Sequence, residues 1–94
     1  VQADDWLVVL TEDPPVLDTA GWVYFKKGDT AKAIEYLERG REKAPNDPSL
    51  NYHLGMAYAK AGKKEQAKDC LKKALAAGRD FQGKEEAIKA LGAL

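Results

Sequence analysis

Two stretches of this chain repeat each other at a fixed distance of thirty-four residues. The matching pairs are Pro14 with Pro48, Gly21 with Gly55, Tyr24 with Tyr58, Lys26 with Lys60, Gly28 with Gly62, Ala33 with Ala67 and Leu37 with Leu71. A repeat of this length is typical of helical hairpins that stack on one another, because a single hairpin cannot bury its apolar face alone. The sequence therefore predicts an all-α solenoid of helical hairpins. Such stacks seldom do chemistry and offer a concave face to another chain.

Helix start and stop signals recur with the same spacing. The Asp-Pro pairs at 13–14 and 47–48 predict helix starts, because Asp accepts hydrogen bonds from free N–H groups and Pro suits the first helical position. Gly28 and Gly62 predict helix ends, since glycine adopts the left-handed C-cap conformation at little cost. Helices are expected over 15–27, 30–43, 48–61 and 64–77, with a truncated helix over 3–10 before them and a closing helix over 83–94 after them.

Small residues predict a close approach of the two helices within each hairpin. Gly21 and Gly55 have no side chain, so the neighbouring helix can interlock with the first helix at these positions. In the closing helix, Ile88, Leu91 and Leu94 are spaced to form one apolar stripe. We expect this stripe to cover the face that the last hairpin would otherwise expose.

The spacing and the residue types together resemble the tetratricopeptide repeat (TPR). The first copy meets the pattern of that family with Leu17, Gly21, Tyr24, Gly28, Ala33, Leu37 and Pro45. The second copy meets it with Leu54, Gly55, Tyr58, Gly62, Ala67, Leu71 and Ala74. Departures are Gly40 in place of the usual Ala, Arg79 in place of the closing Pro, Thr11 in place of Pro, and the bulky Trp6.

The resemblance implies a right-handed superhelix whose first helices line an inner groove. Tetratricopeptide domains act as adaptors or scaffolds that bind peptides or proteins along this groove, without a cofactor and without chemistry of their own. The expected division of the chain is a truncated helix and connection over 1–13, TPR unit 1 over 14–47, TPR unit 2 over 48–78 and a capping helix over 79–94. This organisation suggests the C-terminal end of a longer array.

Side chains that the repeat does not require gather on one face of the first helix of each unit. Asp18, Trp22 and Phe25 recur at i, i+4 and i+7, so they share a face of that helix. Aromatic and methionine side chains are frequent in binding surfaces. The alternative is that Trp22 and Phe25 are core residues that pack against the leading helix. The candidate partner-binding residues are Asp18, Trp22, Phe25, Lys26, Tyr52, His53, Met56 and Lys60.

One subclass of the family binds C-terminal carboxylates through a clamp of Lys, Asn and Arg side chains. Asp18 and Trp22 stand at the first Lys and Asn of that clamp, and His53 stands at the Asn of the second repeat. Asp18 would repel a carboxylate. The sequence therefore predicts that this clamp is absent.

Residues capable of catalysis or metal binding are isolated from one another. His53 is the only histidine and has no Cys or HExxH arrangement near it, so an interface role is expected. Cys70 has no disulfide partner and stands where the first repeat has Tyr36, beside the buried stripe, so a packing role is expected. No glycine-rich phosphate loop is present. The sequence thus predicts a non-enzyme without metal or cofactor.

Charge distribution bears on the choice of partner. The formal net charge is +0, and the lysines from Lys60 to Lys73 lack interleaved aromatic residues, which argues against nucleic acid and favours a solvated face. No segment is apolar enough to enter a membrane, and no targeting segment indicates a compartment, so a cytoplasmic location is the default expectation. Residues 1–31 are acidic and residues 48–78 are basic. An alternative function is therefore head-to-tail self-assembly through the N-terminal end.

Overall fold

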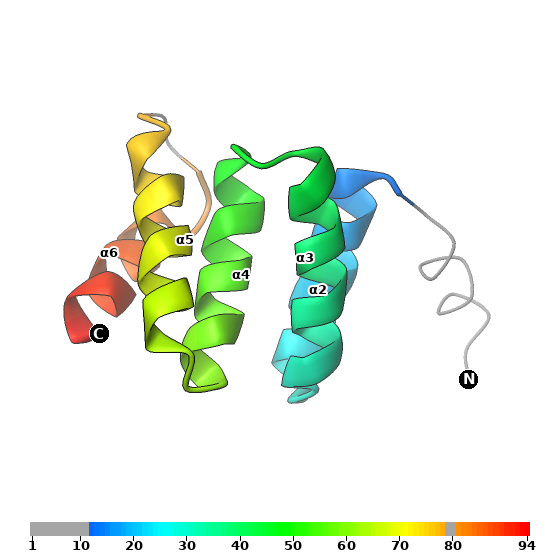
Figure 1. Ribbon diagram of the computed structural model, residues 1–94, viewed down its shortest axis with the longest axis horizontal. Helices are drawn as coiled ribbons and strands as arrows, with labels where there is room; N and C mark the ends of the chain where they lie inside the picture. Colours follow the sequence, from blue (N-terminus) through cyan, green and yellow to red (C-terminus); the bar gives the residue numbers. More distant parts are fainter. Residues whose placement is uncertain (1–11, 79–80) are drawn as a thin grey trace.

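The computed structural model describes residues 12–78 and 81–94, and these residues form five helices (Figure 1). Each helix begins and ends within one residue of the bounds expected from the sequence. The helix predicted over 3–10, with Trp6, and the departures at Thr11 and Arg79 lie outside the described residues. The helices are α2 (Pro14–Lys27), α3 (Thr30–Lys43), α4 (Pro48–Lys60), α5 (Lys64–Ala76) and α6 (Lys84–Ala93).

The helices form two layers of stacked hairpins. Helix α2 packs against α3, and α4 packs against α5, each pair being joined by a tight turn (Figure 1). Contacts between α3 and α4 join the two hairpins, and α6 packs against α5 and α4. Helices α2, α4 and α6 therefore make an inner layer, which lies behind the outer layer of α3 and α5 in Figure 1. The all-α hairpin solenoid predicted from the repeat is confirmed.

Local signals set the helix boundaries. The Asp47 side chain accepts from the backbone N–H groups of Ser49 and Leu50 at 2.9 and 3.3 Å, as an N-cap does. Asp13 holds the N-cap position of α2, but its side chain makes no capping hydrogen bond to that helix. Gly28 closes α2 with a φ of 90°, in the left-handed region that other residues rarely enter.

The two helices of each hairpin touch at a glycine. A Cβ atom built on Gly55 would lie 2.8 and 2.9 Å from the Cγ and Cδ2 atoms of Leu71, closer than packed carbon atoms approach. Gly21 meets Leu37 in the same way in the first hairpin. The close approach predicted from the sequence is confirmed in both copies, and it places the first helix of each unit on the inner layer.

Helix α6 closes the stack with a different stripe from the one predicted. Ala87 is fully buried, and Leu91 and Leu94 pack against the core beside it. Ile88, expected in this stripe, is 53% exposed. The stripe through 87, 91 and 94 is as continuous as the one through 88, 91 and 94, and the helix is rotated so that Ala87 packs against Tyr52, Leu71 and Ala74.

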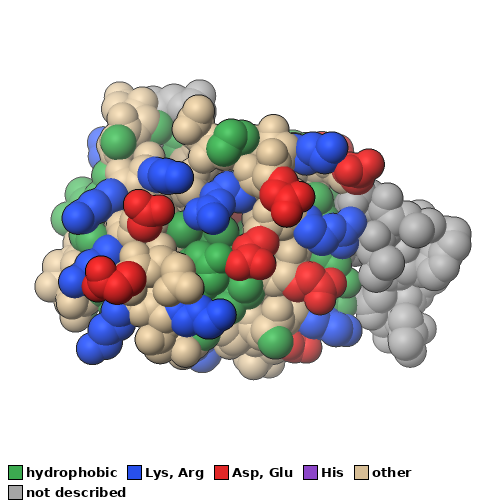
Figure 2. Space-filling model, in the orientation of Figure 1, with side chains coloured by type: hydrophobic (Ala, Val, Ile, Leu, Met, Phe, Trp, Pro, Cys, Tyr) green, Lys and Arg blue, Asp and Glu red, His purple; other side chains and the backbone are tan. Residues whose placement is uncertain are grey.

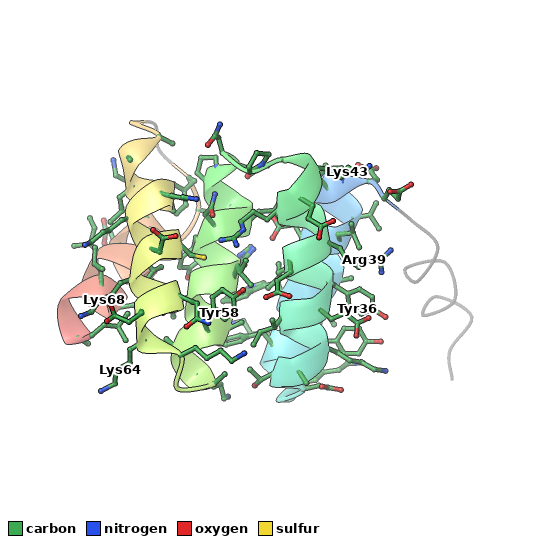
Figure 3. The ribbon with its side chains drawn as sticks, in the orientation of Figure 1. Tyr36, Arg39, Lys43, Tyr58, Lys64 and Lys68 are labelled. Carbon is green, nitrogen blue, oxygen red and sulfur yellow. The ribbon has the colours of Figure 1, made fainter. Side chains whose placement is uncertain are left out.

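The outer face carries charges of both signs. Figure 2 shows lysine, arginine and acidic side chains interspersed over this face, and no histidine is visible on it. Lys64 and Lys68 project from α5, and Lys68 pairs with Glu65 at 3.8 Å (Figure 3). Such exposed pairs contribute little to stability. The lysines of α5 are thus solvated, as the sequence indicated.

Candidate functional site

The inner layer carries a continuous stack of aromatic rings that joins the two hairpins. Trp22 of α2 lies at its centre. Its ring stacks on Phe25 with a centroid distance of 4.7 Å and an interplanar angle of 5°, and on His53 of α4 at 4.1 Å and 24°. We call Phe25, Trp22 and His53 the ring stack. Trp22 and Phe25 are both half-buried and pack against the core clusters to which α4 contributes. The leading helix named in the alternative lies outside the described residues.

Asp18 connects α2 to α4 beside the ring stack. Its Oδ1 lies 2.5 Å from His53 Nδ1, and its Oδ2 accepts from the Ser49 hydroxyl at 2.6 Å. Because an ionised carboxylate only accepts, this contact makes Nδ1 the proton-bearing nitrogen of the ring. The side chains of His53 and Asp18 are only 14% and 15% exposed. The sequence places Asp18 among the candidate partner-binding residues, and in the structure its carboxylate also bridges the two repeats.

Two lysines flank the ring stack. Lys26 Nζ lies 5.1 Å from the centroid of the Trp22 ring, and Lys60 Nζ lies 5.4 Å from that of Phe25. Both side chains are exposed. They occupy equivalent positions one repeat apart, at the last turns of α2 and α4. A positive charge over an aromatic face is attracted by the ring quadrupole, so the two ammonium groups are held near the stack.

Tyr52 lies beside Trp22 and His53, at the end of the ring stack away from Phe25, and it is a buried residue. Only 5% of it is exposed, and its ring lies 5.7 Å from that of Trp22 and 5.8 Å from that of Phe81. Gly83 contacts the edge of the ring so closely that a Cβ atom there would overlap it. Burial, with a smaller effect of nearby Glu86, raises the pKa of Tyr52 above its ordinary value. Met56 is half-buried against the same cluster.

A pocket of about 400 Å³ opens beside these side chains. It is lined by Trp22, Lys26, Ser49, Tyr52, His53, Gln82, Gly83 and Glu86. Four of the eight predicted residues therefore line it, namely Trp22, Lys26, Tyr52 and His53. Phe25 and Lys60 extend the surface from it through the ring stack, Asp18 supports it, and Met56 packs behind Tyr52. We call this pocket and its extension the inner groove.

Sequence reasoning missed Ser49 and the connection before α6. The thirty-four-residue period could have predicted these residues, because it relates Ser49 to Gly83 and Tyr52 to Glu86. It therefore places the connection before α6 at the position of a further first helix. The contact of Ser49 with Asp18 has its counterpart in the contact of Gly83 with Tyr52. Helix α6 thus takes the place of a third first helix, and its first turn lines the groove.

Chemically active groups do not converge in the described part of the chain. Residues 12–78 and 81–94 contain no cluster of three or more His, Cys, Asp or Glu side chains that could hold a metal ion. Cys70 is 1% exposed, and Arg41 Nη1 lies 2.9 Å from its sulfur. Burial raises the pKa of this thiol, which keeps it protonated and weakly nucleophilic. Its predicted packing role is confirmed.

Comparison with known proteins agrees with this architecture. The family model of the tetratricopeptide repeat matches residues 24–94. The chain belongs to the tetratricopeptide repeat family. Repeats of this family generally mediate protein–protein interactions and are generally non-catalytic. Within the described ranges, no helix combines the length and apolarity needed to cross a bilayer.

A mouse protein shares part of the sequence. The chain is 38% identical over 52 residues to interferon-induced protein with tetratricopeptide repeats 2 of Mus musculus. The match covers 52% of this chain and 11% of that protein. The match thus spans about a tenth of the length of the curated relative.

Proposed function

We propose that this chain is a non-catalytic adaptor module that binds a segment of another protein in the inner groove. The observation that supports the proposal is the ring stack with its two flanking lysines. These side chains lie on α2 and α4 beside the pocket described above. The contact residues would be six of the eight predicted from the sequence, extended by Ser49, Gln82 and Glu86, with Asp18 and Met56 supporting them from behind.

Preorganisation favours this surface over the outer face. Phe25 and His53 both stack on the Trp22 ring, and the contact with Asp18 orients His53. Side chains that are already ordered lose little conformational entropy when a partner binds. Tryptophan and tyrosine also dominate binding hot spots when they are central and partly shielded from water. The outer face offers mixed, solvated charges in their place.

A selected peptide provides the test. Peptides selected from a random library against the immobilised chain are titrated into isotope-labelled protein, and amide shift changes map the contact. We expect changes at the ring stack and the pocket, and a Trp22→Leu variant that binds about tenfold or more weakly. Val23→Ala is the matched control, because Val23 is the next residue on α2 and is 45% exposed on another face. Shift changes confined to α3 and α5 would contradict the proposal.

Tyr52→Ala is unsuitable for this test. A buried aromatic truncated to alanine costs about 3–5 kcal/mol of stability, so lost binding would follow from unfolding. Trp22→Leu retains apolar volume while it removes the flat ring face. Thermal unfolding of both variants, measured alongside binding, separates the two effects.

A second candidate function is self-assembly, and the exposed side of α2 favours it. Val16 and Val23 are 42% and 45% exposed, whereas Leu50 and Ala57, thirty-four residues later, are fully buried against the preceding hairpin. An equivalent surface from a second copy could cover these valines through a head-to-tail contact. We expect light scattering to show masses above 10.3 kDa that rise with concentration and fall in Val16→Asp/Val23→Asp. A constant monomer mass would exclude assembly.

A further inference from the structure

We propose that the segment bound in the inner groove is an acidic peptide, recognised through its side-chain carboxylates by Lys26 and Lys60. This inference rests on the proposed function and specifies the class of partner. The same two lysines recur one repeat apart, so a peptide that follows the groove meets them in succession. The chain terminus of the peptide is not required, since the carboxylates belong to Asp or Glu side chains.

Lys26 and Lys60 are available for a ligand. Within residues 12–78 and 81–94, the ion pairs engage Lys43, Lys68, Lys73 and His53, and neither groove lysine takes part. Each ammonium group instead lies within 6 Å of an aromatic centroid, and the two rings involved are stacked at 4.7 Å. An ammonium held over a ring keeps its hydrogen-bond donors free for a carboxylate.

Neighbouring charges reinforce the positive end of the groove. Lys27 at the end of α2 and Lys63 in the turn after α4 add positive charge, against Asp29 in the turn after α2. The acid nearest the ring stack is Asp18, and both of its oxygens are engaged by His53 and Ser49. The lysine end of the groove therefore carries net positive charge, and the nearest acid, Asp18, is already hydrogen-bonded. This charge complements a run of carboxylates on a peptide.

The other end of the groove is negative, which gives the ligand a direction. Glu86 and Gln82 line the pocket there, and the charge of Glu86 contributes to the raised pKa of Tyr52. An acidic peptide would place its carboxylates at the lysines and an uncharged or basic residue beside Glu86. Successive centroids of the ring stack lie 4.1 and 4.7 Å apart, so about three extended residues at ~3.3 Å each cover it.

A nucleic acid fits these charges less well. Lysines and stacked rings also bind phosphate and bases. A polynucleotide carries a negative charge at every step, however, so its backbone would meet Glu86 in the same pocket that holds its bases. A peptide can be acidic at one end only. The charge pattern of the groove therefore favours a peptide.

Matched peptides and charge variants test the inference. The probes are fluorescein-labelled peptides with blocked ends that carry two Asp–Glu pairs, a leucine–phenylalanine pair and a C-terminal lysine. Two control peptides have the same sequence except that Asn–Gln pairs or lysine pairs replace the Asp–Glu pairs. Anisotropy at low and raised salt measures the affinity. We expect only the acidic peptide to bind tightly, with an affinity that falls as salt rises.

Charge reversal identifies the residues responsible. In Lys26→Glu/Lys60→Glu the acidic peptide should bind about tenfold or more weakly, and the lysine peptide should gain affinity. The control Lys64→Glu/Lys72→Glu makes the same change of net charge on α5 and should leave both affinities nearly unchanged. Equal losses in the two double variants would overturn the inference, because they would indicate net charge alone.

Three other outcomes would also overturn it. Library peptides that map to the ring stack without acidic residues would leave the proposed function standing and remove only the acidic specificity. Tighter binding of oligouridylate than of the acidic peptide, lost in Lys26→Glu/Lys60→Glu, would assign the lysines to nucleic acid. Failure of every peptide to shift the groove resonances would remove both proposals together.

Discussion

Gly55 determines how closely α4 and α5 approach. Gly55→Ala would place a methyl group 2.8 Å from Leu71 Cγ, an atom that cannot move without displacing the branched side chain. We expect a loss of about 1–3 kcal/mol in the free energy of unfolding, measured by urea titration, because overpacking exceeds the gain in helix propensity.

Gly92 provides the matched control for this substitution. It is also helical, and no atom lies within 4 Å of a Cβ built on it. Gly92→Ala should be neutral or stabilise the chain by up to about 1 kcal/mol, since only backbone entropy changes. Equal effects of the two substitutions would show that the contact with Leu71 relaxes freely.

The environment of the Tyr58 hydroxyl leads us to expect a loss of stability in alkaline solution. Its hydroxyl donates to Glu38, and burial together with this bond raises its pKa above the ordinary value of 10.0. The folded chain therefore holds this proton more tightly than the unfolded chain, so stability is fully present below pH 10 and declines above it, by up to about 1.4 kcal/mol per pH unit. Urea titrations from pH 9 upward should show a smaller decline in Tyr58→Phe. Identical slopes would contradict this account, because other titrating groups are common to both proteins.

At the scale of one element, α6 offers two adjacent residues with opposite environments. Ala87 is fully buried against Tyr52, Leu71 and Ala74, whereas Ile88 is 53% exposed. Ala87→Asp would bury an unpaired carboxylate and should cost more than about 3 kcal/mol. Ile88→Asp should change stability by no more than about 0.5 kcal/mol, because Ile88 lies on the exposed surface of α6. The reverse order would restore the stripe predicted from the sequence.

The same helix shows what the sequence could and could not predict. Helix bounds followed from Asp47, Gly28 and Gly62, whose effects are local and depend on a few neighbouring backbone atoms. The rotation of α6 did not follow from the sequence, because Ala87 and Ile88 both start apolar stripes and only tertiary packing against Tyr52, Leu71 and Ala74 distinguishes them.

The candidate site also has features that the sequence predicted and features that it could not predict. Periodicity placed Asp18, Trp22 and Phe25 on one face of α2, since residues at i, i+4 and i+7 of any helix share a face. The hydrogen bonds of Asp18 to Ser49 and His53 depend on the angle between two hairpins, which no spacing in the sequence encodes. The burial of Tyr52 depends on the connection before α6 for the same reason.

For the whole molecule, the repeat allows one prediction that compares equivalent positions. Leu50 is fully buried between the hairpins, where it contacts Gly40, and Val16 occupies the same position of α2 but is 42% exposed. Leu50→Ala should lower the free energy of unfolding by about 2–5 kcal/mol, because it leaves a cavity in the contact that joins the hairpins. Val16→Ala should change it by less than about 1 kcal/mol. A large effect of Val16→Ala in dilute, monomeric protein would mean that another part of the chain covers α2.

The Asp18 bridge has a mechanical consequence. The Asp18 carboxylate bonds to Ser49 and His53, which lie one turn apart on α4 of the next hairpin. Any tilt or slide of that hairpin relative to α2 would stretch at least one of these two hydrogen bonds. A second link joins the two hairpins between α4 and α3, where the Tyr58 hydroxyl donates to Glu38. A change in the angle between the hairpins would strain at least one of these links. We therefore expect the two hairpins to resist bending relative to each other, so that a ligand meets a surface whose shape is largely set before it binds.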